Sequence, residues 1–209
     1  MTLPKHLLDG YSRFRSGRYA AEADRYLQLG EGPQKPKLMI IACCDSRAAP
    51  ETIFDAGPGE IFAVRNVANL VPAYAPDGKH HSTSAAIEFA VLSLAVKDII
   101  VMGHGRCGGI RAVIDENAPL SKGDFIGKWM SGVEDLVHAV RQDHEDHATL
   151  ATAVERASIE HSVANLRTFP WLRMKEKKGE IGLHGAWFDI GFGELHIYDD
   201  AAHRWNLTT

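Results

Sequence analysis

The sequence contains little cysteine, and this limits the kinds of protein it can be. Only three of its 209 residues are Cys. Small secreted domains that depend on disulfides carry many more, usually in even numbers. The chain also holds eleven His. The few thiols are therefore either buried, inert side chains or metal ligands.

Two further features are missing: an excess of basic charge and a long apolar segment. The formal net charge at pH 7 is −4, so no overall positive field attracts nucleic acid. The longest uninterrupted apolar run is residues 38–44, far short of the roughly 20 residues that a membrane helix requires. The N-terminus shows no apolar segment followed by a small-residue cleavage site, so no secretory signal is expected. We predict a cytoplasmic protein with no nucleic-acid or membrane partner.

Apolar runs and amphipathic segments alternate along the chain, which is typical of an α/β fold. The last two predicted strands are joined by a short turn that contains glycine, so they should pair antiparallel. The prediction is a mostly parallel β-sheet with an antiparallel C-terminal edge, flanked by helices. Strands are expected at residues 38–43, 61–64, 98–102, 181–190 and 194–199, and helices at 50–55, 84–96 (with Ser82 or Ser84 as N-cap), from Ile110, at 124–146 and at 149–169.

The segment before the first strand is typical of amphipathic helix. It covers residues 5–30 and is interrupted near Ser16 and Gly17, a pair that weakens helix at that point. No linker, repeat or low-complexity segment divides the rest of the chain. We predict a single domain over residues 1–209, in which residues 1–35 form an N-terminal helical arm.

Chemically active side chains follow two of the predicted strands. Cys43, Asp45 and Arg47 come at the end of the first, and His104 and Cys107 come just after the third. In open α/β sheets, ligands bind at the carboxyl ends of the strands. Two thiolates and one imidazole suit zinc, and a Cys₂His set with one open position is typical of a catalytic zinc site.

Each of these residues also has a plainer interpretation. A single Cys at the end of a buried strand is usually a packing residue, and His-x-x-Cys alone is a weak pattern. The adjacent Cys43 and Cys44 would suit redox chemistry, although no Cys-x-x-Cys is present. Asp45 and Arg47 could form an ordinary ion pair in a solvated loop. Only the joint arrangement of the two segments is specific. Cys44 should point to the other face of the strand as a packing thiol.

At these residues the sequence resembles the β-class carbonic anhydrases. The family pattern Cys-x-Asp-x-Arg followed by His-x-x-Cys is matched by Cys43, Asp45, Arg47, His104 and Cys107. The resemblance extends over roughly residues 5–200. Further matching segments are residues 58–69, 84–88, 183–190 and 193–195.

The resemblance implies a zinc enzyme that hydrates CO2 reversibly to bicarbonate and a proton. Its zinc ligands would be Cys43, His104 and Cys107, with one Zn²⁺ per subunit, and Asp45 and Arg47 would form the catalytic pair beside the metal. In the family some site groups come from a second subunit, so a homodimer or a dimer-based tetramer is expected. By resemblance, the substrate-binding residues would be Gln34, Phe62, Val67 and the N–H of Gly108.

Two departures from family patterns refine this prediction. Phe89 stands where the plant-type branch has a tyrosine, so that hydroxyl is missing from any proton relay. Ile40 stands where the allosteric branch has a tryptophan. We predict a plant-type, non-allosteric enzyme whose Asp45 stays off the metal near neutral pH. His80 and His81 would be either a proton relay or part of a solvated loop.

Two other functions remain open at this point. A relative on the same scaffold that hydrolyses CS2 or COS would share the zinc ligands. A non-catalytic zinc module would instead show a closed site with four protein ligands. The presence of Asp45 and Arg47 argues against the non-catalytic module.

Overall fold

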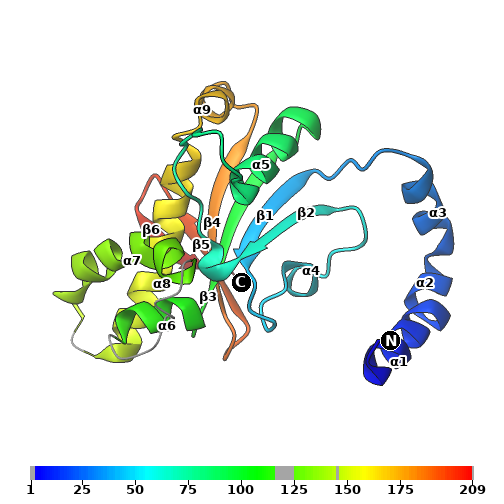
Figure 1. Ribbon diagram of the computed structural model, residues 1–209, viewed down its shortest axis with the longest axis horizontal. Coiled ribbons are helices and arrows are strands. Elements are labelled where there is room, and N and C mark those ends of the chain that lie inside the picture. The colour runs from blue at the N-terminus through cyan, green and yellow to red at the C-terminus, as the bar shows by residue number, and fades with distance from the viewer. Residues whose placement is uncertain (1–2, 116–124, 145, 209) are drawn as a thin grey trace. The chain divides into compact units, whose positions relative to one another are not determined.

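The computed structural model describes residues 3–115, 125–144 and 146–208, and its centre is one six-stranded sheet (Figure 1). The strand order is β2-β1-β3-β4-β5-β6. Strands β2, β1, β3 and β4 run parallel, and β5 and β6 add antiparallel at one edge. The predicted fold class is confirmed. The strands are β1 (Leu38–Cys43), β2 (Ile61–Asn66), β3 (Asp98–His104), β4 (Gly182–Asp189), β5 (Glu194–Asp199) and β6 (Arg204–Leu207).

Helices cover both faces of this sheet unequally. On one face, α8 packs against β3 and β4, and α6 and α7 pack against α8 (Figure 1). On the other face, Ile53 of α4 packs on Ile40 and Ala42. Strand β1 is buried along nearly its whole length, as expected for a parallel strand with side chains covered on both faces. The helices of this unit are α4 (Pro50–Ile53), α5 (Ser82–Glu88), α6 (Gly108–Ile114), α7 (Ile126–Arg141), α8 (His147–Leu166) and α9 (Pro170–Lys177).

The N-terminal segment forms a compact unit of its own. Contacts divide the chain into Met1–Lys35 and Pro36–Thr209, the same boundary that was predicted for the arm. The first unit contains α1 (Lys5–Ser16), α2 (Arg18–Ala21) and α3 (Ala23–Glu31), so the predicted interruption near Gly17 is confirmed. Its aromatic side chains pack on one another; they are Tyr11, Phe14, Tyr19 and Tyr26. The single-domain organisation itself stays a prediction.

Several details differ from the sequence-based prediction. Helix α5 begins at Ser82 with His81 as its N-cap, and no side chain caps it, so the assignment of Ser82 or Ser84 as N-cap was wrong. After Glu88 the helix continues as the π-helical turn Phe89–Ser93. Helix α9 and strand β6 were not predicted. Pro170, the first residue of α9, is a common helix-start signal, whereas β6 has only four residues. No helix in the described ranges is long and apolar enough to cross a membrane.

Candidate metal centre

The three predicted metal ligands lie together at the carboxyl edge of the sheet. Cys43 ends β1 and His104 ends the neighbouring β3, while Cys107 is the N-cap of α6. Their ligand atoms all lie within 4.8 Å of one another, and the two sulfurs are 3.9 Å apart. All three side chains are buried. In the part of the chain that the structure describes, this is the one group of His, Cys, Asp and Glu side chains spaced to hold a metal ion.

The imidazole of His104 is oriented for a metal. Its Nδ1 lies 2.9 Å from the carbonyl oxygen of Gly105, so Nδ1 carries the hydrogen and donates it. In the neutral imidazole, the other nitrogen, Nε2, then presents a lone pair. Nε2 is buried and has no hydrogen-bond partner among the described residues. A buried polar atom without a partner is costly, and a metal ion at this point removes that cost.

The two thiols lie close enough that a hydrogen bond between them shifts their pKa values in opposite directions. A hydrogen bond from Cys107 holds the pKa of Cys43 well below its usual range, and His104 adds to this effect. The same hydrogen bond raises the pKa of Cys107. Zn²⁺ is bound by thiolate and neutral imidazole in tetrahedral geometry. Two sulfurs and one free imidazole nitrogen therefore fit zinc with a fourth position open.

Asp45 and Arg47 form a bidentate ion pair beside this group, which we call the fork. Arg47 donates from Nε to Asp45 Oδ1 at 3.0 Å and from Nη2 to Oδ2 at 2.7 Å, and its backbone N–H donates to Oδ1 at 2.9 Å. These bonds hold the pKa of Asp45 well below its usual range, so the carboxylate stays charged. Asp45 Oδ2 lies 3.9 Å from His104 Nε2. The carboxylate is thus next to the metal group without belonging to it.

Comparison with known proteins identifies the family. The sequence pattern of the carbonic anhydrase family matches residues 38–195 of this chain. This chain belongs to the β-carbonic anhydrase family. Carbonic anhydrases are lyases, and the prediction of an enzyme of this class is confirmed.

Individual relatives cover the chain to different extents. A carbonic anhydrase of Pseudomonas aeruginosa is 36% identical over 204 residues, which span 96% of this chain and 90% of that protein. The chloroplastic β carbonic anhydrase 5 of Arabidopsis thaliana is 37% identical over 181 residues, or 85% of this chain. The match spans only 58% of that plant protein's length. Among solved structures, the β-carbonic anhydrase CcaA superposes with a TM-score of 0.89 at 28% identity, over 98% of both chains.

The backbone that carries the first carbonic anhydrase motif is braced from strand β2. Arg65 donates from Nε to the carbonyl oxygen of Cys43 at 2.9 Å and from Nη2 to that of Asp45 at 2.6 Å. These bonds fix the turn that follows β1. Arg65 lies in the matching segment 58–69, but sequence reasoning assigned it no role, because its contact with the turn depends on the register of β1 and β2.

A buried glutamate supports the second motif, and sequence reasoning missed it. Glu155 of α8 is only 2% exposed. Its carboxylate accepts the N–H of Cys107 at 3.0 Å and the indole N–H of Trp187 at 3.1 Å. Burial raises the pKa of Glu155, although these two donors oppose the rise. The signal in the sequence was its place between the apolar residues of α8, where a carboxylate needs partners.

Replacing Glu155 by glutamine should loosen the candidate metal site. The amide offers one accepting oxygen to two buried donors, so Cys107 or Trp187 loses its bond. We expect about 1–3 kcal/mol less unfolding free energy and roughly tenfold weaker zinc binding. Urea denaturation and competition with a chelator measure the two quantities.

Glu160→Gln is the matched control for this substitution. Glu160 lies on the same helix and also accepts an indole N–H, that of Trp205 at 2.8 Å, but it does not contact the metal loop. Zinc affinity should therefore stay unchanged in Glu160→Gln. Equal loss of zinc affinity in both variants would contradict a specific role for Glu155.

The predicted substrate-binding residues do not all meet at the metal group. Gly108 begins α6 directly after Cys107, so its N–H has no acceptor within the helix. Phe62 pairs in register with Met39, four positions before Cys43, which places it roughly 13 Å away along the strand. Its ring instead contacts Phe89 at 5.9 Å between centroids. Gln34 belongs to the N-terminal unit.

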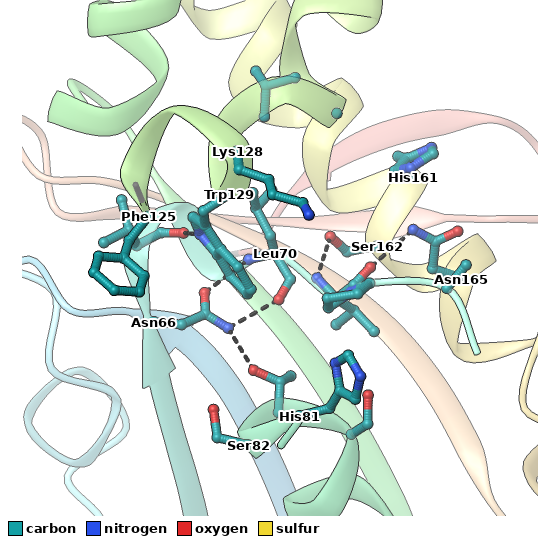
Figure 2. Close-up of a pocket in the computed structure, with 18 of the residues that line it drawn as sticks. Asn66, Leu70, His81, Ser82, Phe125, Lys128, Trp129, His161, Ser162 and Asn165 are labelled. Carbon is teal, nitrogen blue, oxygen red and sulfur yellow. Dashed lines mark hydrogen bonds between the residues drawn. The ribbon is translucent and has the colours of Figure 1, made fainter. Parts of the chain in front are cut away.

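Val67 lines an open cavity of about 1000 Å³ next to the end of β2 (Figure 2). The cavity lies between η1 (Val67–Asn69), the start of α5, and helices α7 and α8. Trp129 donates its indole N–H to the carbonyl oxygen of Val67 at 2.8 Å. His80 and His81 also line the cavity, and His81 is paired with Asp77 at 2.7 Å. None of the three metal ligands lines it.

The third cysteine is not the packing thiol that was predicted. Cys44 is exposed. Strand β1 ends at Cys43, and the chain then turns, although the N–H of Cys44 still donates to the carbonyl oxygen of Asn66. The alternation of strand side chains therefore does not bury Cys44.

Proposed function

We propose that this chain hydrates CO2 reversibly to bicarbonate with one zinc ion held by Cys43, His104 and Cys107. The observation that carries the proposal is the free, buried Nε2 of His104 beside two sulfurs that are 3.9 Å apart. The charged fork of Asp45 and Arg47 next to this group supports it further. When bound, zinc supplies a nucleophile by lowering the pKa of water toward neutrality, an effect for which carbonic anhydrases are the standard example.

The residues of the chain then have distinct tasks. Asp45 accepts a hydrogen bond from the reacting water and so orients a lone pair toward the carbon of CO2. Arg47 keeps Asp45 charged and holds it in one orientation. The N–H of Gly108, which has no acceptor within helix α6, donates to a substrate oxygen. Val67 adds apolar surface, which suits an uncharged substrate.

We also propose that the smallest active unit is a homodimer and that such dimers can pair into a dimer-based tetramer. Phe62 lies far along β2 from Cys43 in its own chain, so a role at the metal requires the Phe62 of a second copy. A fungal β-carbonic anhydrase of Sordaria macrospora, described as tetrameric, shares the fold with a TM-score of 0.82 at 24% identity. Light scattering after size exclusion measures the assembly, and an active monomer would contradict it. A cytoplasmic location stays a prediction.

Stopped-flow measurement of CO2 hydration, with the zinc content of the same sample, tests the function. We expect about one zinc per chain and a turnover within or above the usual range for enzymes, about 1–1000 per second. Stoichiometric zinc without hydration would contradict the proposal. Release of hydrogen sulfide from CS2 or COS by that sample would then favour the hydrolase, and no reaction would favour a non-catalytic zinc module.

A further inference from the structure

Arg106 stands between two metal ligands in a backbone conformation that side chains disfavour. Its φ is 61°, in the left-handed region that glycine adopts easily and other residues rarely do. His104 and Cys107 flank this short loop. A residue persists in such a conformation when surrounding contacts hold it there.

The side chain of Arg106 is anchored to the end of strand β4. Its Nη1 donates to Asp189 Oδ1 at 2.8 Å. The same oxygen accepts the N–H of Gly191 at 2.6 Å and that of Phe192 at 3.3 Å. A Cβ on Gly191 would lie 2.6 Å from the guanidinium nitrogens of Arg106, so a side chain at this position would displace the end of Arg106. The anchor of Arg106 therefore consists of the Asp189 carboxylate, the turn that follows β4 and Gly191 within that turn.

The backbone of Arg106 connects this anchor to the catalytic pair. Its carbonyl oxygen accepts a hydrogen bond from Arg47 Nη2 at 3.3 Å. That same nitrogen donates to Asp45 Oδ2 at 2.7 Å. A continuous series of contacts thus runs from Asp189 through Arg106 and Arg47 to Asp45.

The two ends of the loop have separate supports. The N–H of Gly105 donates to the carbonyl oxygen of Phe188 at 2.9 Å. The N–H of Cys107 donates to Glu155 at 3.0 Å. Loss of the Arg106 side chain should therefore leave the ligands in place and release mainly the Arg106 carbonyl.

We propose that Arg106 and Asp189 are positioning residues: their ion pair holds the Arg106 carbonyl where it fixes Arg47, and through Arg47 the orientation of Asp45. The proposal rests on the function proposed above. Neither residue is assigned a contact with substrate or metal. They raise the fraction of molecules in which the Asp45 carboxylate is oriented toward the reacting water.

Arg106→Gly is the decisive variant, because glycine accepts the left-handed backbone and removes only the anchor. We expect kcat for CO2 hydration to fall about tenfold, with KM within about twofold of wild type and one zinc per chain retained. Asp189→Asn should lower kcat in the same direction. The kcat of the double variant should be no lower than that of Arg106→Gly, because both substitutions break the same ion pair.

Asp200→Asn is the matched control. It weakens another ion pair at a strand end, in which Arg167 Nη2 lies 2.7 Å from Asp200 Oδ2, just past the end of β5 and away from the edge that carries the metal ligands. Its kcat should equal that of wild type. A tenfold loss in this control as well would overturn the proposal, since it would show a general effect of ion-pair loss.

A crystal structure of zinc-loaded Arg106→Gly gives a test that does not depend on activity. We expect Asp45 to leave the fork with Arg47 in part or all of the molecules. The proposal is overturned if that fork is unchanged, if kcat stays within about twofold of wild type, or if activity falls only in step with zinc. Wild-type protein without CO2 hydration would overturn the proposed function instead, and the crystal structure would still decide on the positioning of Asp45.

Discussion

Cys107→Ser should lose zinc and, with it, CO2 hydration. A serine hydroxyl stays protonated near neutral pH, whereas the metal needs a thiolate. The substitution leaves one sulfur and one imidazole in a buried site that is built for three ligands. We expect zinc affinity to fall by at least about 100-fold, beyond the effect of losing a residue that only supports a ligand. Metal analysis after chelator competition and stopped-flow hydration on the same sample measure both losses.

The neighbouring thiol provides a control for this substitution within the same chain. Cys44→Ser changes the same functional group at an exposed position that is not part of the metal group. Zinc content and hydration should match those of wild type. Stoichiometric zinc in Cys107→Ser, or its loss in Cys44→Ser, would show that the ligands are wrongly assigned.

Asp45→Asn should keep zinc but lose most of the activity. The amide has a single accepting oxygen, and Arg47 donates to both oxygens of the present carboxylate. In the variant, the side-chain NH2 group faces one of the Arg47 donors, so that hydrogen bond is lost. The side chain also loses its negative charge and is no longer held toward the reacting water. We expect kcat to fall about 100-fold, with about one zinc per chain retained. Stopped-flow hydration and metal analysis separate the two effects.

Asp98→Asn controls for the loss of an exposed carboxylate in an ion pair. Asp98 is the first residue of β3, at the opposite end of the strand from His104, and it pairs with His184 at 2.9 Å. Its substitution should leave kcat unchanged. If Asp45→Asn lost metal as completely as Cys107→Ser, Asp45 would have to be reassigned as a metal ligand.

The grouping of residues at the carboxyl ends of apolar strands could be predicted from the sequence. Cys43 ends a strand that is buried along nearly its whole length, and His104 ends another. Neighbouring parallel strands place their carboxyl ends at one edge, so the order of residues along the chain was enough to expect the trio with Cys107. The exposed Cys44 shows the limit of this reasoning, because the exact end of β1 decided where its side chain points.

The prediction of the substrate-binding residues depended on the family resemblance and not on a local sequence pattern. Gly108 directly follows the candidate ligand Cys107, and Val67 directly follows the last residue of β2. The structure therefore places both near the carboxyl edge of the sheet. Phe62 and Gln34 are different. The register of β2 carries Phe62 away from Cys43, and the N-terminal unit holds Gln34. A role of Phe62 at the metal is therefore a proposal that requires a second copy of the chain, and the role of Gln34 stays a prediction.

The sequence by itself determined the α/β class, the positions of β1 to β5 along the chain and the group of candidate metal ligands, because these follow from local periodicity and from the way parallel strands end. The tertiary structure decided how that group is supported. Glu155 reaches Cys107 across 48 positions of the chain, and Asp189 reaches Arg106 across 83. Such contacts depend on how α8 and β4 pack beside β3, and no short stretch of sequence carries that information.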